Sequence, residues 1–384
     1  MDAAVCRTGR YYRPELDVVR FLAFLLVFLM HTLPQRGEPR AAAILGGFAP
    51  LFYDAVSACV FGLSLFFTLS AFLICELLLR EKQASGTVHV RQFYIRRILR
   101  IWPLYYLGLA LGLGFVFPAG GDRATLVGMG WYAVFLGAWY DAIYTTLNSP
   151  AGPLWSVSVE EQFYLMAPWV VKHCGRKRMF GFCGALLLSA NAWLFFLGRA
   201  QVPTAKIWNN TFVQFECFAA GILLCLVLRG RLPRIGMWLR AAVLLAAGLC
   251  WMGAVAAVRV GAEWTDAPGS WRLMGEYALA AVGAVLILVA FLGIDAGKLP
   301  RWAVYLGRIS FGLYVYHGFA IYITKRFLFG PVASYAGPLI LVKGLATLGL
   351  DVLMAAISYR FIETPFLKLK QKHAVIESQP VAGG

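Results

Sequence analysis

The sequence predicts an all-α polytopic membrane protein with ten transmembrane helices, one interfacial or re-entrant segment, and both termini in the cytoplasm. Three observations lead to this fold class. Of the 384 residues, 60% are hydrophobic and only 14% are charged, whereas soluble domains are about half apolar and about a quarter charged. The mean hydropathy is +0.69. Apolar runs of nearly spanning length fill the chain, which excludes disorder, a coiled coil and an ordinary soluble enzyme.

The number of helices follows from these runs, because a spanning helix needs about 20 mainly apolar residues. Eleven runs come near that length. They begin near Leu16, Ala58, Ile101, Leu126, Leu154, Met179, Trp208, Arg240, Leu273, Ala303 and Leu339. No soluble domain of useful size lies between them. We therefore expect a single transmembrane domain over residues 1–370 and a polar tail over residues 371–384.

Lysine and arginine set the expected direction of the helices, because cytoplasmic loops are enriched in both. Four stretches are strongly basic: the N-terminus and residues 80–100, 172–178 and 229–240. If all four are cytoplasmic, the third helix ends outside and the helix beginning near Leu154 also starts outside. The run from Leu126 to Ala138 lies between them, so we interpret it as interfacial or re-entrant rather than as a crossing.

The net charge of +16 fits the same arrangement. No basic stripe lies on a polar domain, so we attribute the charge to cytoplasmic loops and not to nucleic-acid binding. The first apolar run lacks a small-residue cleavage site, so we expect it to remain as the first helix.

The first predicted helix carries Asp17, Arg20 and His31 among apolar neighbours. An ionisable group at the bilayer centre costs on the order of 3 kcal/mol, so each needs a partner or a wet cavity. Asp17 and Arg20 are spaced for a local ion pair. Arg20 and His31 are three helical turns apart and share one face, with His31 about 16 Å closer to the outside. We expect this face to line a cavity; a headgroup position for His31 is the structural alternative.

Two adjacent carboxylates, Glu160 and Glu161, lie one to two turns inside the helix that begins near Leu154. Their side chains point about 100° apart. We therefore expect at most one of them to face the same cavity as His31, while the other bonds a neighbouring helix. Structural hydrogen bonding by both carboxylates is the alternative.

Arg97 and Arg100 lie one turn apart at the cytoplasmic entrance of a helix. Two guanidinium groups on one helix face suit a polyphosphate ligand. A positive-inside anchor, which every membrane protein needs, is the simpler alternative.

The remaining polar residues of the apolar runs give weaker indications. His317 is expected toward the outer leaflet, where a lone histidine can equally be functional or a helix–helix hydrogen bonder. We interpret Glu216 and Asp351 as structural. The cysteines show no metal-ligand spacing, so we expect buried free thiols and no metal site. They are Cys6, Cys59, Cys75, Cys174, Cys183, Cys217, Cys225 and Cys250.

In chain order, six short motifs of this sequence resemble the acyltransferase-3 family of integral membrane O-acyltransferases. They are Leu16-Asp17-x-x-Arg20-x-x-Ala23 with His31, Gly62 to Ile74, Arg97-x-x-Arg100-Ile-x-Pro103-x-Tyr105, Trp155 to Tyr164, Ser310-Phe311-x-x-Tyr314-x-x-His317, and Phe361-Ile362-Glu363-x-Pro365. Each motif is short, but together they cover nearly the whole chain. Ala71 departs from the family, which usually has Gly after Ser70; this predicts slightly looser helix packing or a different acyl slot. The sequence resembles the standalone form, without a C-terminal esterase-like domain.

The resemblance implies transfer of an acyl group, commonly acetyl, from cytoplasmic acyl-CoA to a hydroxyl of a cell-envelope or exported carbohydrate. Its motifs assign the candidate residues to three groups. These are His31, Glu160 and Glu161 for catalysis, Arg20, Arg97, Arg100 and Tyr105 for acyl-CoA binding, and Ser70, Trp155 and His317 for the acyl channel or acceptor site. Our hypothesis is that His31 acts as general base on the acceptor hydroxyl and that Glu160 or Glu161 orients it.

The same resemblance sets expectations for cofactors, partners and location. We expect acyl-CoA, with acetyl-CoA as first candidate, as a co-substrate, and no permanently bound cofactor. The expected partners are the lipid bilayer, the carbohydrate acceptor and other envelope-biosynthesis proteins, and the expected location is a bacterial inner membrane.

A proton-coupled transporter or flippase is the alternative, because buried His, Glu and Arg side chains also line transport pathways. The sequence shows no internal repeat and no pair of Gly- or Pro-broken helices at matching positions, which are typical of transporters. A transporter also has no need of paired arginines at the inner mouth. We therefore favour the enzyme.

Overall fold

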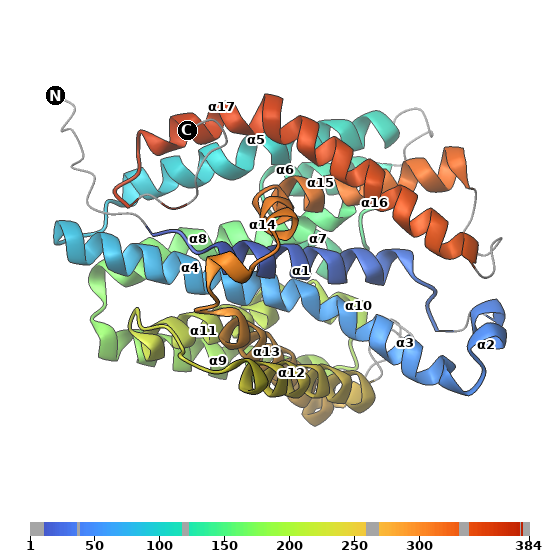
Figure 1. Ribbon diagram of the computed structural model, residues 1–384, viewed down its shortest axis with the longest axis horizontal. Coiled ribbons are helices and arrows are strands. Elements are labelled where there is room, and N and C mark those ends of the chain that lie inside the picture. The colour runs from blue at the N-terminus through green and yellow to red at the C-terminus, as the bar shows by residue number, and fades with distance from the viewer. Residues whose placement is uncertain are drawn as a thin grey trace.

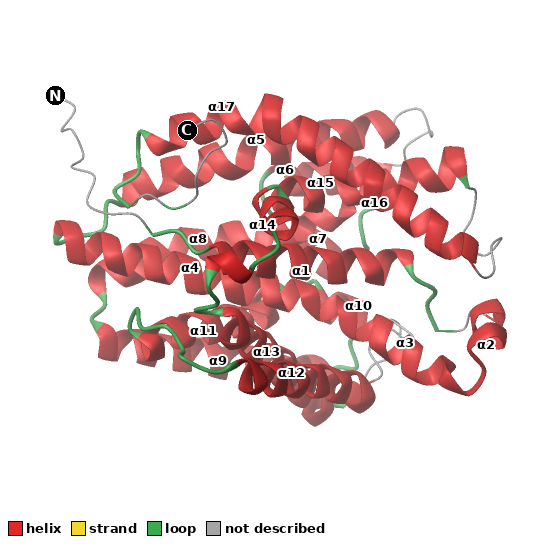
Figure 2. Ribbon diagram, in the orientation of Figure 1, coloured by secondary structure: helices red, strands yellow, loops and turns green. Residues whose placement is uncertain are grey.

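The computed structural model describes residues 11–36, 39–116, 123–258, 269–329, 338–376 and 378. Within these ranges every regular element is a helix (Figure 2), which confirms the predicted all-α class. Most of the long helices run side by side along the longest axis of the molecule (Figure 1). The first ten residues and nearly all of the predicted tail after residue 376 lie outside the described residues.

Ten helices correspond to the ten predicted crossings. They are α1 (Pro14–Thr32), α4 (Gly62–Ser85), α5 (Val90–Val116), α8 (Trp155–His173), α9 (Arg176–Arg199), α11 (Thr211–Leu228), α12 (Met237–Val258), α13 (Ser270–Phe291), α15 (Ser310–Ile323) and α16 (Pro338–Ser358). Shorter helices connect or extend them. These include α2 (Pro39–Leu45), α3 (Ala49–Ala58), η2 (Cys59–Phe61), α6 (Arg123–Ala133), α7 (Gly137–Ile143), η4 (Gly152–Leu154), α10 (Thr204–Trp208), α14 (Arg301–Arg308), η6 (Thr324–Leu328), η8 (Tyr359–Glu363) and α17 (Thr364–Gln371).

Among the described residues, seven helical segments are long and apolar enough to cross a membrane. They are Ala42–Ser85, Val90–Phe115, Arg176–Arg199, Thr211–Leu228, Met237–Ala256, Ser270–Phe291 and Leu339–Gln371. The first two begin well before the apolar runs that predicted them. Helices α1, α8 and α15 are shorter or carry more polar residues, so a crossing by each of these three stays a prediction.

The run from Leu126 to Ala138 forms parts of two short helices, α6 with 11 residues and α7 with 7. At 1.5 Å per residue these helices are about 16 and 10 Å long, whereas the hydrocarbon core is about 30 Å thick. Neither helix can cross by itself, which agrees with the interpretation of this run as a segment that does not span.

Several of the predicted cytoplasmic stretches meet at one end of the bundle. The guanidinium carbon of Arg80, near the end of α4, lies 4.3 Å from the centre of the Tyr11 ring, just before α1. Lys82 donates to the carbonyl of Val171 near the end of α8, at 2.7 Å. Arg96 on α5 donates to the carbonyl of His373 beyond α17, at 3.0 Å. The start of α1 and the segment after α17 therefore share one end, as predicted; that this end faces the cytoplasm stays a prediction.

Small residues bring α4 and α11 close together beside the site. A Cβ atom on Gly221 would lie 2.2 Å from the carbonyl oxygen of Thr68 and 2.8 Å from the Cβ of Ala71. Ala71 is completely buried. The structure thus corrects the prediction of looser packing at Ala71: the methyl group fits because the facing residue of α11 is a glycine.

A second close contact fixes α1. A Cβ atom on Gly307 of α14 would lie 1.9 Å from the carbonyl oxygen of Asp17. The backbone of α14 therefore rests directly on α1 at the turn that carries its ion pair, so the depth of Asp17 in the bundle is set by backbone contact.

The last motif, Phe361 to Pro365, forms a change of direction. The backbone turns in a wider, π-helical spiral at η8 and then enters α17, where Pro365 occupies the first turn. A π-turn inserts a residue into the helical repeat and rotates the helix beyond it. This rotation changes which face of α17 turns toward the bundle.

We expect Gly221→Ala to destabilise the protein by about 1–3 kcal/mol, because the added methyl group overlaps the backbone of α4. Gly248→Ala is the matched control, since a Cβ atom at this glycine in α12 meets nothing within 4 Å and alanine favours a helix. Thermal unfolding of the detergent-purified variants measures the difference. Equal midpoints for both variants would contradict the close packing of α4 and α11.

Candidate functional site

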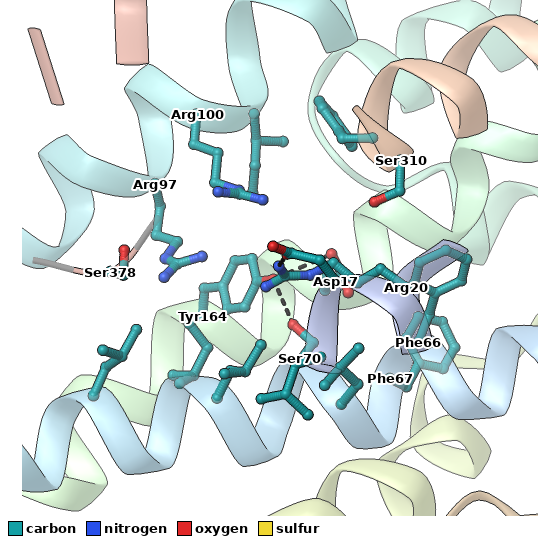
Figure 3. Close-up of a pocket in the computed structure, with 18 of the residues that line it drawn as sticks. Asp17, Arg20, Phe66, Phe67, Ser70, Arg97, Arg100, Tyr164, Ser310 and Ser378 are labelled. Carbon is teal, nitrogen blue, oxygen red and sulfur yellow. Dashed lines mark hydrogen bonds and ion pairs between the residues drawn. The ribbon is translucent and has the colours of Figure 1, made fainter. Parts of the chain in front are cut away.

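A cavity opens near the basic end of the bundle and reaches between α1, α4, α5, α8, α15 and α17 (Figure 3). Its volume is about 150 Å³, room for on the order of ten water molecules. Its polar and charged lining consists of Tyr11, Tyr12, Arg13, Asp17, Arg20, Ser70, Arg97, Arg100, Ser156, Glu160, Tyr164, Ser310, Tyr314, Lys370 and Ser378. Apolar side chains such as Leu63, Phe66 and Phe67 complete the wall.

Arg97 and Arg100 both extend from α5 into this cavity (Figure 3). The guanidinium carbon of Arg97 lies 5.3 Å from the centre of the Tyr164 ring and 5.5 Å from that of Phe93. Its Nε atom is buried and has no hydrogen-bond partner among the described residues. Two aromatic faces therefore hold the Arg97 group by cation–π attraction, an arrangement that leaves guanidinium N–H groups available to an anionic ligand.

Arg20, which is also predicted to bind acyl-CoA, forms the expected local ion pair with Asp17. Its Nη1 atom lies 2.6 Å from Oδ1 of Asp17. The other carboxylate oxygen of Asp17 accepts a hydrogen bond of 2.9 Å from Tyr12, whose hydroxyl in turn accepts from Arg308. Arg20 therefore reaches the cavity as part of a network at the start of α1, with one carboxylate balancing its charge.

A hydrogen-bonded chain crosses the cavity floor from α8 to α4. The Tyr164 hydroxyl donates to Oε2 of Glu160 at 3.1 Å and lies 2.7 Å from the hydroxyl of Ser70. Since an ionised carboxylate only accepts, the Tyr164 proton points to Glu160 and the Ser70 hydroxyl donates to Tyr164. Glu160 thus fixes the ring that lies against Arg97.

Glu161 points away from this chain and does not line the cavity. Its Oε2 atom accepts from the indole of Trp102 at 3.4 Å, and its Oε1 atom is buried without a partner in the described part of the chain. The expectation that the two carboxylates diverge is therefore correct, with Glu160 on the cavity side.

His31 and His317 form a pair outside the cavity lining. Their ring centres are 5.5 Å apart. Nδ1 of His317 lies 2.6 Å from the carbonyl oxygen of Tyr314, and because a carbonyl only accepts, Nδ1 carries the hydrogen. In the neutral ring Nε2 is then an acceptor; it is buried, and no described residue gives it a hydrogen bond. His31, in the last turn of α1, is exposed.

This arrangement corrects one part of the catalytic hypothesis. Among the described residues, the hydrogen bonds of Glu160 and Glu161 go to Tyr164 and Trp102, so neither carboxylate orients His31. The reason is geometric: both glutamates are on α8, while the ring that lies against His31 comes from α15.

Tyr314 connects the cavity to the histidine pair. Its hydroxyl lies 2.6 Å from that of Ser156 and donates to the carbonyl of Pro153 at 2.8 Å. Its backbone carbonyl holds His317, and the two ring centres are 5.4 Å apart. Tyr314 is thus hydrogen-bonded both to Ser156 in the cavity and to His317 of the histidine pair.

Besides Glu161, His31 and His317, two more predicted site residues, Tyr105 and Trp155, do not line the cavity. The Tyr105 hydroxyl donates to the carbonyl of Tyr132 at 2.7 Å, and its ring stacks on Phe135 at 4.5 Å. Tyr105 therefore ties α5 to the last turn of α6 and to the loop that follows it. Trp155 is buried in the first turn of α8 and is likewise absent from the lining.

Sequence reasoning missed Tyr164, Tyr314 and Lys370 as cavity residues. Both tyrosines stand inside the motifs that carry the family resemblance, so the signal was present but not used. Glu363 belongs to such a motif too, and its Oε1 atom would be 3.1 Å from a Cβ atom on Gly312 of α15. Lys370 follows the last motif, and no local pattern marks it.

Comparison with known proteins places this site in a family. The model of the acyltransferase domain matches residues 13–355. The chain belongs to this acyltransferase family. The family is the one that the sequence motifs resemble, and an O-acyltransferase of the membrane is the class that fits both the match and the apolar helices.

Three relatives illustrate the similarity. The chain is 27% identical to a peptidoglycan O-acetyltransferase of Listeria monocytogenes, over 94% of this chain and 57% of that protein. It is 23% identical to a putative O-acetyltransferase of Staphylococcus aureus, over 93% of this chain and 58% of the relative, and 25% identical to nodulation protein 10 of Rhizobium leguminosarum, over 80% and 82%. The chain thus spans less than three fifths of the first two. No solved structure matches it.

We expect Glu160→Gln to lower acyl transfer at least about tenfold more than Glu161→Gln. Glu160 carries the charge that fixes Tyr164 beneath Arg97, and a hydrogen bond to a charged group is worth about 1.5–3 kcal/mol. Acyl transfer by membranes that contain equal amounts of each variant measures the ratio. An equal or larger loss in Glu161→Gln would mean that the cavity-facing carboxylate is not the important one.

Proposed function

We propose that the protein transfers an acyl group, with acetyl as first candidate, from cytoplasmic acyl-CoA to a hydroxyl of a cell-envelope or exported carbohydrate. The transfer takes place at the outer face of a bacterial inner membrane. The observation that carries this proposal is the cavity in which Arg97 and Arg100 stand beside the Glu160–Tyr164–Ser70 chain. The names of the relatives support an O-acetyl transfer.

The donor enters the cavity from the basic end. Its phosphates bind Arg97 and Arg100, which present guanidinium groups on one face of α5. Its pantetheine arm extends past Ser70 and the apolar wall toward Tyr314, because this direction leads to the histidine pair. Arg20 and His31 stand about 16 Å apart along α1, the span that the arm has to cover.

The acceptor hydroxyl is activated at the other end of this path. An uncharged sugar hydroxyl is a weak nucleophile at neutral pH and needs a general base. His31 takes the hydroxyl proton, the hydroxyl oxygen bonds to the thioester carbonyl carbon, and the bond to sulfur breaks. The protonated His31 then gives this proton to the departing CoA thiolate and returns to its neutral form.

His317 replaces the carboxylate as the partner of His31. Its Nδ1–H is held by the Tyr314 carbonyl, so Nε2 can accept a hydrogen bond from the first ring. Such a bond fixes the tautomer of His31 and leaves its other nitrogen to accept the proton from the substrate. Glu160 acts further down the cavity, by holding Tyr164 and through it Arg97.

Binding of acetyl-CoA to the detergent-purified protein tests the donor. We expect Arg97→Ala and Arg100→Ala each to weaken binding by about tenfold to a hundredfold, the loss of a charge-assisted hydrogen bond. Arg91→Ala is the control, because Arg91 lies on the same helix but is exposed and outside the cavity. If the folded wild type releases no CoA thiol and binds no acetyl-CoA, the donor is wrong and the transporter becomes the better explanation.

The role of His31 has a separate test. We expect His31→Ala to keep the wild-type affinity for acetyl-CoA but to lose acyl transfer by about a hundredfold or more, the typical contribution of a general base. His173→Ala, at an exposed histidine at the end of α8, should retain transfer. Full activity in His31→Ala would end the proposed role.

A further inference from the structure

Lys370 is a buried cation that neither the family match nor the motifs include. It lies on α17, fifteen residues beyond the matched range of 13–355. Only 8% of its surface is exposed, and its side chain lines the same cavity as Arg97 and Arg100. Within the described residues its ammonium group has neither a hydrogen bond nor an ion pair with a carboxylate.

The charges around Lys370 are predominantly positive. Burial above all, and then the charges of Arg100, Arg97, Arg96 and Arg20, disfavour a positive charge on its side chain when no ligand is bound. Among the described residues, five cationic side chains line the cavity, against two carboxylates. They are Arg13, Arg20, Arg97, Arg100 and Lys370, with Asp17 and Glu160.

Nearby carboxylates already form ion pairs with other cations. Asp17 holds Arg20, and Glu81 holds Arg96 at 2.7 Å. A buried cluster of like charges is unfavourable unless counter-charges compensate it. The five cationic side chains of the cavity lining exceed its two carboxylates by three, an excess that suits a ligand with several phosphates.

The fold holds Lys370 in this place from both sides. Before it, the π-turn of η8 redirects the chain, and Thr364 closes the turn by donating to the carbonyl of Tyr359 at 2.7 Å. After it, His373 is tied to α5 through Arg96 at 3.0 Å and through Gln92 at 2.9 Å. A solvated lysine would not need these constraints.

We propose that Lys370 binds a phosphate group of the donor together with Arg97 and Arg100, so that α17 forms part of the donor site. The inference rests on the proposed function for the identity of the ligand, but the cation cluster defines the ligand chemistry independently: an anion with at least two phosphates.

The proposal predicts two effects of opposite sign in one variant. Lys370→Met keeps an unbranched apolar side chain, one atom shorter than lysine, and removes the charge. Affinity for CoA should fall by about tenfold to a hundredfold, while the ligand-free protein should unfold at a higher temperature, because the repulsion among the cations is relieved. A structural lysine would lower the unfolding temperature instead. Lys368→Met, two residues away and exposed, should change neither quantity, and Lys370→Arg should retain most of the affinity.

Binding is measured with CoA and, separately, with inorganic pyrophosphate, on the detergent-purified full chain. If the wild type binds CoA and Lys370→Met binds it equally well, the inference is overturned and the proposed function stands. If the wild type binds pyrophosphate but not CoA, and Lys370→Met loses the pyrophosphate, the anion site stands and the proposed donor fails. Binding of neither probe to the wild type would refute both.

Discussion

The placement of positive charge inside an apolar bundle is the constraint on which the rest of this structure depends. A guanidinium group in a hydrocarbon layer needs an ion pair with a carboxylate, an aromatic face, or an anionic ligand. Arg20 pairs with Asp17 and Arg97 lies against Tyr164. The cavity lining as a whole keeps five cationic side chains against two carboxylates, which favours an anionic ligand. Glu160, Tyr164 and Ser70 then take the positions that hold these cations at the cavity wall.

The packing of the helices serves the same constraint. Helices in a bilayer associate through close contact of small residues and through polar bonds, since lipid is as apolar as the side chains. Gly221 against Ala71 and Gly307 against Asp17 bring backbones together where the polar groups gather. These two contacts therefore fix α11 against α4 and α14 against α1 beside the cavity.

The sequence predicted interactions within one helix better than interactions between helices. The Asp17–Arg20 pair, the divergence of Glu160 from Glu161 and the shared face of Arg97 and Arg100 all follow from helical geometry, and the structure has them. The partner of His31 was wrong, because which helix lies beside α1 depends on packing that no spacing reveals. Tyr105 fits a family motif but donates its hydrogen bond to the last turn of α6. Lys370 could not be found, because its position depends on a π-turn whose sequence signal is weak.

Tyr314 links the cavity to the His31–His317 pair. Its hydroxyl bonds to Ser156 in the cavity wall and its carbonyl sets the tautomer of His317, so a displacement of this one residue reaches both. Under the proposed function the acyl group changes compartments while neither carrier molecule does. The transfer reaction then carries the acyl group across the membrane. Cleavage of the thioester bond supplies the free energy that a transporter would take from an ion gradient.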